Sequence, residues 1–334
     1  GAFAAAAEAE LNGIACCPGS SGPGHVHLIN GLYDAHRSNC SVLAIASTCP
    51  SDQFGTGYFQ ETDPIRLFDD CSGYNQMAVT PAQFARMLPA ALQHAVHKCE
   101  VAVVGLPGDV AASPCAESPG AAGPLPSHGI YRPLDGELRQ LAEMIGSAER
   151  ITVFCGIGAR EAHDEVVRLA AMLKAPVAYT FKAKMEVQYD NPYEIGMTGL
   201  LGLPSAYGAM HESDLLLLLG TDFPYDCFLP SECRIAQVDI RPERIGRRAR
   251  VELGLAGDVK DTLQALLPML RERSDRTFLD RQLKIYRALC DDMAAVASKR
   301  GSTGNIAPEY VATLIDSLAS DSAIFTVDLS LIHI

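Results

Sequence analysis

Two glycines in the middle of the chain have the spacing of a nucleotide-binding turn. Gly156 and Gly158 follow an apolar run over residues 151–155 and precede a helical segment. Glycine at such a turn lets the chain bend tightly and lets a phosphate approach the backbone N–H groups that begin the helix. The full dinucleotide fingerprint would need a third glycine at position 161, where this chain has Glu161. A tight turn without a ligand therefore explains the two glycines equally well.

A second group of candidates follows the leucine run at residues 215–219. The chain continues there as Gly220-Thr221-Asp222-Phe223-Pro224-Tyr225, and the next apolar run ends at Asp239. In nucleotide-binding sheets, an acid at the carboxyl end of a neighbouring strand binds a ribose hydroxyl. Asp239 is a candidate for that role, and a surface loop with a capping aspartate is the alternative.

Glycines and polar residues also gather near the N-terminus. The run Gly19-Ser20-Ser21-Gly22-Pro23-Gly24 leads into a helical pattern, but it lacks the Gly-Lys-Ser/Thr sequence of a phosphate loop. Phe59-Gln60-Glu61 lies in a glycine-containing loop and could line a pocket. His27 and His36 do not have the i, i+4 spacing of a metal-binding pair, so no metal site is predicted.

The elements that must position these residues are alternating strands and helices. Continuous apolar runs predict strands buried on both faces, whereas apolar residues at three- and four-residue steps predict amphipathic helices. Helices of this length supply the crossovers that parallel strands need, so we predict an α/β fold with parallel sheets flanked by helices. The predicted strands cover residues 42–46, 101–104, 151–154, 176–179, 215–219, 235–240 and 323–327, and helical patterns cover 84–96 and 166–173.

Composition divides the chain into domains. We expect a partial domain over residues 1–113, a proline-rich linker over 114–135 and a whole domain over 136–273. A linker helix and the beginning of a third domain are expected over 274–328. Both ends resemble the interior of a longer protein, and the last residues, 329–334, resemble a translated sequencing adapter, which predicts a non-native tail.

Composition and charge exclude several classes of function. The chain has 334 residues, of which 48% are hydrophobic and 20% charged, as in soluble globular enzymes. Lys and Arg (27) against Asp and Glu (40) leave a net charge of −13, which argues against nucleic acid as a partner. No apolar run reaches the length of a membrane span. The 11 cysteines include no CxxC pair, so we expect buried free thiols in a reducing cytosol.

Several of these runs together resemble one family of enzymes. Gly22-Pro23-Gly24-x-x-His27-Leu28-x-Asn30-Gly31-Leu32 and Gly55-x-Gly57-Tyr58-Phe59-Gln60-Glu61 are similar to the pyrimidine-side domain of thiamine-diphosphate enzymes acting on pyruvate. Tyr189-Asp190-Asn191-Pro192-Tyr193-x-x-Gly196-Met197-Thr198-Gly199-Leu200-Leu201-Gly202 and Gly220-Thr221-x-Phe223-Pro224-Tyr225 resemble the central flavin domain of one branch. That branch is the quinone-dependent pyruvate dehydrogenases, also called pyruvate oxidases, and the resemblance covers residues 2–328.

The resemblance implies an activity and a set of cofactors. It implies oxidative decarboxylation of pyruvate to acetate and CO2, with thiamine diphosphate, Mg²⁺ and FAD as cofactors and ubiquinone as electron acceptor. Phe59 and Gln60 would be catalytic and would face the reacting carbon across a dimer interface. FAD would contact Thr198, Gly199, Leu200, Leu201, Thr221, Asp222, Phe223, Pro224, Tyr225 and Asp239, with Gly156 and Gly158 added because of their place after a predicted strand.

The resemblance also implies an assembly and a location. We expect a homo-oligomer, a dimer or tetramer, in the cytoplasm and peripheral to the inner face of the cell membrane through a C-terminal tail. The family's catalytic glutamate would lie upstream of Ala2, and the Gly-Asp-Gly motif that holds Mg²⁺ and the diphosphate would follow Asp328. We therefore expect that residues 1–334 do not turn over pyruvate by themselves.

Three alternative functions stay open. Acetohydroxyacid synthase keeps a flavin in the same central domain but uses a second 2-oxoacid, and residues 197–202 and 223–225 favour the quinone-linked branch over it. A pyruvate oxidase that uses oxygen and phosphate is a closer alternative. A non-catalytic nucleotide-binding module, built on the central domain, is an alternative of another class.

Overall fold

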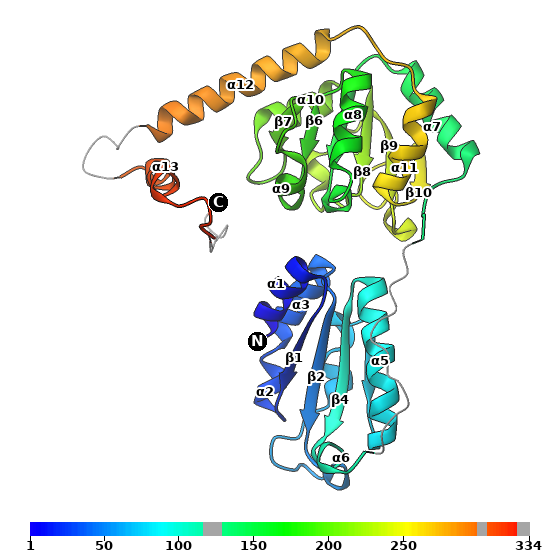
Figure 1. Ribbon diagram of the computed structural model, residues 1–334, viewed down its shortest axis with the longest axis vertical. Helices are drawn as coiled ribbons and strands as arrows, with labels where there is room; N and C mark the ends of the chain where they lie inside the picture. Colours follow the sequence, from blue (N-terminus) through cyan, green and yellow to red (C-terminus); the bar gives the residue numbers. More distant parts are fainter. Residues whose placement is uncertain (116–128, 299–305, 326–334) are drawn as a thin grey trace. The chain divides into compact units, whose positions relative to one another are not determined.

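The computed structural model describes residues 1–115, 129–298 and 306–325, which belong to two compact units, Gly1–His128 and Gly129–Ile334 (Figure 1). Most of the predicted linker and all of the predicted tail at 329–334 lie outside the described residues. Each unit contains its own parallel sheet, and none of the described helices is long and apolar enough to cross a membrane.

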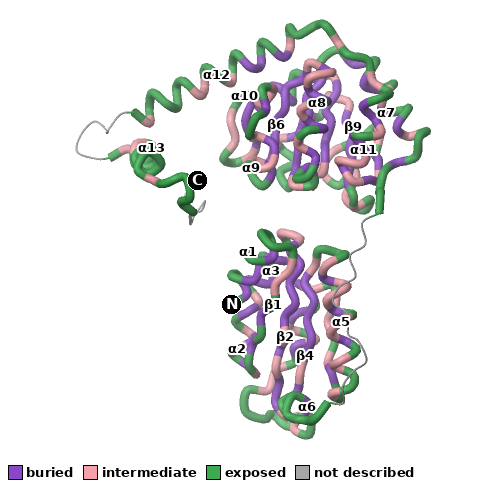
Figure 2. Tube along the Cα trace, in the orientation of Figure 1, coloured by how far each residue is buried: buried purple, intermediate pink, exposed green. Residues whose placement is uncertain are grey.

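The first unit is a four-stranded parallel sheet with helices on both faces. Its strands lie in the order β1-β2-β4-β3 and are β1 (Ala15–Gly19), β2 (Val42–Thr48), β3 (Tyr74–Met77) and β4 (Val101–Pro107). Its helices are α1 (Ala2–Asn12), α2 (Pro23–Val26), α3 (Ile29–Ser38), α4 (Pro64–Leu67), α5 (Pro81–Lys98) and α6 (Gly108–Ala112). Successive β2 residues enter different cores: Val42 and Ala44 pack with α1 and α3, and Leu43 packs with α5. Burial on both faces is therefore confirmed for β2 (Figure 2).

The second unit is built on a six-stranded parallel sheet in the order β10-β9-β8-β5-β6-β7. The strands are β5 (Ile151–Cys155), β6 (Val177–Tyr179), β7 (Glu194–Met197), β8 (Leu215–Leu219), β9 (Arg234–Asp239) and β10 (Leu253–Ala256). Three helices pack on one face: α7 (Asp135–Ser147), α8 (His163–Leu173) and α11 (Val259–Leu266). Two pack on the other: α10 (Pro204–Glu212) and the first turns of α12 (Thr277–Ala297). The α/β fold with parallel sheets flanked by helices is confirmed.

The remaining helices are short or lie late in the chain. They are α9 (Lys184–Val187) and α13 (Pro308–Leu318). No residue of α13 is buried, and the buried residues of α12 are confined to its first two turns (Figure 2).

The order of strands in the second sheet reverses beside β5. From β5 the chain runs outward through β6 to β7, then returns to place β8 on the other side of β5 and continues to β9 and β10. Loops that follow β5 and β8 therefore leave the same edge of the sheet in opposite directions. In open parallel sheets, ligands bind at this switch point.

The strand predicted over residues 323–327 is wrong in its described part. Residues 323–325 have no regular structure, and Ile324 and Phe325 are exposed. Among the residues that the structure describes, no strand lies beside this run to pair with its backbone or cover its side chains. An apolar run forms a buried strand only where such neighbours exist. Residues 326–327 lie outside the described residues.

Candidate functional site

The residues predicted to contact FAD lie at the carboxyl ends of four parallel strands. Gly156 and Gly158 follow β5, residues 198–201 follow β7, residues 221–225 follow β8, and Asp239 ends β9. Since all strands of the sheet are parallel, these residues share one edge of it. This end of the sheet includes the switch point between β5 and β8, and we call it the switch edge.

The turns after β5 and β8 pack directly on each other. Gly156 N–H donates to Leu219 O at 2.9 Å, and Gly158 N–H donates to Gly220 O at 3.0 Å. A Cβ at Gly156 would lie 2.4 Å from Gly220 O, and one at Gly158 would lie 2.8 Å from Gly220 Cα. Close packing of the two backbones therefore requires glycine at both positions, with or without a ligand.

The loop after β7 contacts the loop after β8. Gly199 has a φ of 120°, and a Cβ at this position would lie 3.3 Å from the Phe223 ring. Phe223 is buried and packs edge-to-face on Phe154, with ring centroids 5.3 Å apart. The structure thus brings together two runs that are separated in the sequence. The neighbouring apolar side chains Leu200, Leu201 and Tyr225 are exposed, as is Pro224.

Two threonines of the predicted site are buried, and they differ in their hydrogen bonds. Thr221 is 5% exposed, and its backbone oxygen accepts the side-chain amide of Gln237 at 3.2 Å. Thr198 is 4% exposed, and its hydroxyl has no hydrogen-bond partner. A buried polar atom without a partner costs about 1–3 kcal/mol. The Thr198 hydroxyl is therefore available to bond a ligand and fits a polar group of a bound flavin.

Asp222 already has strong partners. Its Oδ2 lies 2.9 Å from Arg247 Nη1, and its Oδ1 lies 3.0 Å from Arg248 Nε. These ion pairs connect the loop after β8 to the segment after β9. Asp222 therefore links the two loops through an arginine on each carboxylate oxygen.

Asp239 is a buried acid at the end of β9. It is 5% exposed, and Oδ1 accepts the backbone N–H of Arg241 at 2.9 Å. Burial raises the pKa of Asp239, nearby Asp222 raises it further, and Arg244 opposes the shift. A hydroxyl donor brought by a ligand would stabilise the ionised form.

The prediction from sequence did not include four arginines that follow Asp239 in the chain. Arg241, Arg244, Arg247 and Arg248 all follow β9 within ten residues of Asp239. Burial lowers the pKa of Arg244, and Arg241 lowers it further, whereas Asp239 and Asp222 raise it. The signal available in the sequence was a run of arginines directly after a strand that ends in an acid. Guanidinium groups of this kind bind phosphate oxygens.

Phe59 and Gln60 lie in the first unit, in the loop that follows β2. Phe59 is 77% exposed. Gln60 has a φ of 59°, and its backbone oxygen accepts the Ser21 hydroxyl at 3.0 Å. A Cβ at Gly22 would lie 2.7 Å from Gln60 Cβ, so the glycine-rich turn at residues 19–24 supports this loop closely.

His25, a buried residue of α2, hydrogen-bonds the same loop through Thr62. Its ring is fully buried, with Nδ1 2.9 Å from Ser47 O and Nε2 2.6 Å from Thr62 Oγ1. In the neutral ring, Nδ1–H donates to the carbonyl and Nε2 accepts the Thr62 hydroxyl. Burial lowers the pKa of His25, which favours this neutral form.

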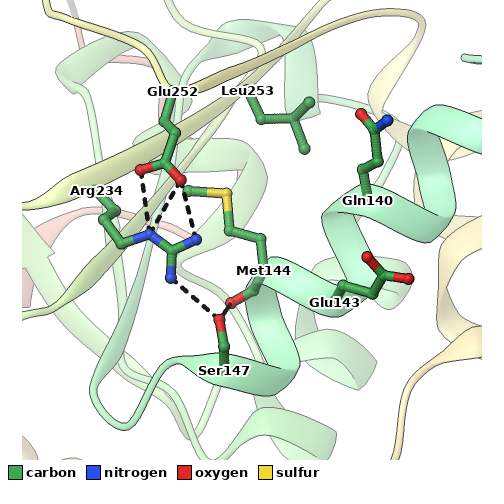
Figure 3. Close-up of a pocket in the computed structure, with 7 residues that line it drawn as sticks. All are labelled: Gln140, Glu143, Met144, Ser147, Arg234, Glu252 and Leu253. Carbon is green, nitrogen blue, oxygen red and sulfur yellow. Dashed lines mark hydrogen bonds and ion pairs between the residues drawn. The ribbon is translucent and has the colours of Figure 1, made fainter.

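A pocket of about 440 Å³ lies elsewhere in the second unit, between α7 and the first residues of β9 and β10 (Figure 3). Arg234 pairs there with Glu252 at 3.0 Å and donates to the Ser147 hydroxyl at 3.1 Å. No residue of the predicted site lines this pocket. In the described ranges, no group of three His, Cys, Asp or Glu residues is arranged to hold a metal ion.

Comparison with known proteins shows that the chain belongs to the thiamine pyrophosphate enzyme family. Residues 1–67 match the N-terminal thiamine-pyrophosphate-binding domain of these enzymes, and residues 138–266 match their central domain. The chain is 49% identical over 288 residues to an uncharacterised 42.6 kDa protein of Pseudomonas amyloderamosa, covering 86% of this chain and 73% of that protein.

Two longer relatives match over this entire chain. YdaP of Bacillus subtilis, described as thiamine pyrophosphate-containing, is 33% identical over 100% of this chain and 58% of its own length. Pyruvate oxidase of Lactiplantibacillus plantarum is 29% identical over 100% of this chain and 56% of its own length. The family also includes acetolactate synthases, which match at 28% identity. The chain thus spans little more than half the length of these longer relatives.

Proposed function

We propose that this chain belongs to an enzyme that decarboxylates pyruvate oxidatively to acetate and CO2 and passes the electrons through FAD to ubiquinone. The observation that carries the proposal is the meeting of residues 198–201 and 221–225 at the switch edge, with the buried Thr198 hydroxyl left without a partner. The similarity to a pyruvate oxidase supports pyruvate as the substrate.

The residues at the switch edge would hold FAD in the following way. Thr198 would hydrogen-bond the flavin, Asp239 would accept a ribose hydroxyl, and Arg244 with its neighbours would neutralise the diphosphate. Exposed Leu200 and Tyr225 would cover apolar parts of the cofactor. When bound, thiamine diphosphate supplies the electron sink for decarboxylation and FAD accepts the electron pair, with Mg²⁺ holding the diphosphate.

Phe59 and Gln60 would act on the substrate side. The NH₂ group of the Gln60 side chain can donate a hydrogen bond to a carboxylate or carbonyl oxygen of pyruvate. The oxygen of the same amide can accept a hydrogen bond from a donor. The exposed Phe59 ring would exclude water from the reacting carbon when a partner surface covers it. Such a partner surface is the reason that we also propose a homo-oligomer, a dimer or tetramer.

We also propose that the whole enzyme lies in the cytoplasm, at the inner face of the cell membrane.

Anaerobic flavin reduction tests the activity. The experiment uses a protein that contains this chain and has the full length of its longer relatives. It is loaded with FAD, thiamine diphosphate and Mg²⁺ and mixed with pyruvate, and the absorbance of the oxidised flavin is followed. We expect the absorbance to fall and to recover on addition of a ubiquinone analogue. Flavin that stays oxidised while thiamine diphosphate is bound would contradict the proposal.

The products separate the alternatives in the same experiment. Recovery only with oxygen, together with phosphate-dependent acetyl phosphate, would favour the oxygen-using pyruvate oxidase. Acetolactate without net flavin reduction would favour acetohydroxyacid synthase. Sedimentation of the full-length protein as a monomer at all concentrations would contradict the proposed assembly.

A further inference from the structure

The loop that presents Phe59 and Gln60 is closed by the next residue. Glu61 Oε1 accepts the Gly55 N–H at 2.5 Å, and Oε2 accepts the N–H groups of Gly57 at 2.8 Å and Tyr58 at 3.2 Å. We propose that Glu61 is a positioning residue, whose carboxylate locks residues 55–61 and thereby fixes Phe59 and Gln60 in the conformation that meets the substrate. The lock itself stands apart from the proposed function, but its consequence for turnover rests on it.

The backbone of this loop is shaped to receive a carboxylate. Gly55 and Gly57 have φ values of 78° and 74°, although nothing lies within 4 Å of a Cβ at either position. Crowding therefore does not explain these left-handed conformations. Turns with left-handed residues direct successive N–H groups into a concave site that binds anions. Here the anion belongs to the chain itself, and the backbone hydrogen bonds lower the pKa of Glu61.

Gln60 also shows that contacts hold the loop in an unfavourable backbone conformation. Its φ of 59° lies in the left-handed region, which is unfavourable for a residue that carries a Cβ. Such a conformation persists only where surrounding contacts determine it. Those contacts are the Ser21 hydroxyl on Gln60 O, the Glu61 carboxylate on the amides before it, and the Thr62 hydroxyl on His25.

Phe59 lies between two residues whose backbone groups are hydrogen-bonded, Tyr58 and Gln60, and its own side chain is exposed. Each residue from Gln60 to Thr62 makes a hydrogen bond, Gln60 through its backbone oxygen and the next two through their side chains, while the Phe59 side chain is 77% exposed. A rigid frame with an exposed aromatic tip is the arrangement that positions a binding residue. Glu61 supplies the part of that frame that lies within the loop.

A single fluorescent reporter tests the lock directly. The chain contains no tryptophan, so Phe59→Trp introduces a unique indole at the tip of the loop. Its anisotropy decay is compared in three proteins: F59W, F59W with E61Q, and F59W with D52N. Asp52 is an exposed acid of the same loop, so D52N controls for the loss of one negative charge. We expect the amplitude of fast indole motion to rise about twofold with E61Q and to stay unchanged with D52N.

Equal amplitudes in all three proteins would overturn the proposal. If E61Q prevents folding, hydrogen exchange of the unsubstituted chain decides instead: slow exchange of the Gly55, Gly57 and Tyr58 amides supports the lock, and exchange at the rate of an unstructured peptide overturns it. In the full-length enzyme, E61Q should lower kcat about tenfold with FAD binding unchanged. A loop that loosens in an enzyme with no activity toward pyruvate would refute the proposed function and leave the lock standing.

Discussion

At the scale of single residues, the switch edge depends on positions where no side chain fits. The backbone of Gly220 occupies the space that a Cβ at Gly156 or Gly158 would need. Cofactor binding and chain packing therefore predict the same residue type there, and the structure shows that packing alone is sufficient. The residues that separate the two explanations are those with unsatisfied groups, Thr198 above all.

Substitution of these glycines should destabilise the second unit. Gly156→Ala places a methyl group against Gly220 O, and Gly220→Ala places one against Gly158 in a left-handed conformation with a φ of 61°. We expect each to lower the free energy of unfolding by about 2 kcal/mol, measured by urea denaturation. Gly146→Ala in α7 is the control, because nothing lies within 4 Å of its Cβ, and it should leave stability equal or raised. An equal effect of all three substitutions would contradict this account of the switch.

The buried acid at the end of β9 should cost stability at neutral pH. Burial raises the pKa of Asp239, so its contribution to stability is most favourable at pH values below the ordinary aspartate pKa and declines as pH rises through the raised value. Asp239→Asn removes the buried charge and should raise Tm at neutral pH, by an amount that shrinks as the solution is acidified. The same change should weaken FAD binding. A lower Tm than that of the exposed-site control Asp226→Asn at neutral pH would show that the ionised form is favoured instead.

At the scale of elements, the strands that sequence patterns identified correctly are those inside the sheets. The four strands without a clear apolar signal, β1, β3, β7 and β10, all lie at sheet edges. An edge strand pairs on one side and buries fewer side chains, so it tolerates polar residues, glycine and proline. β1 contains Pro18, and β3 reads Tyr-Asn-Gln-Met. The central strands were predictable because both of their faces enter a core, and the longer helices were predictable because one apolar face packs on a sheet.

One long helix is attached to the sheet by a shared carboxylate. Glu194 on β7 accepts the hydroxyls of Tyr179 on β6 and Tyr286 on α12, each at 2.7 Å. Tyr286→Phe removes the bond from α12, and we expect a loss of about 1 kcal/mol in unfolding free energy and faster amide exchange in α12. The control is Tyr310→Phe on α13, a half-buried tyrosine away from this contact. If both variants behave alike, the carboxylate does not hold the helix.

At the scale of the whole molecule, the sequence predicted which residues gather at the carboxyl ends of the strands better than how these residues pack there. Residue runs at strand ends identified the edge, because the carboxyl ends of parallel strands converge there. The contact between Gly199 and Phe223, the pairing of Asp222 with Arg247 and Arg248, and the isolation of the Thr198 hydroxyl depend on packing between segments far apart in the chain. No pattern within one segment carries that information.

The central claim is that the six-stranded unit binds FAD at its switch edge, and an absorption spectrum tests it most directly. The purified chain is incubated with FAD, desalted and scanned, alongside Thr198→Val and the control Thr262→Val, which removes another buried hydroxyl without a partner. We expect stoichiometric flavin in the unsubstituted chain and in the control, and about tenfold weaker binding in Thr198→Val. A folded chain that retains no flavin, or a Thr198→Val variant that retains it fully, would contradict the claim.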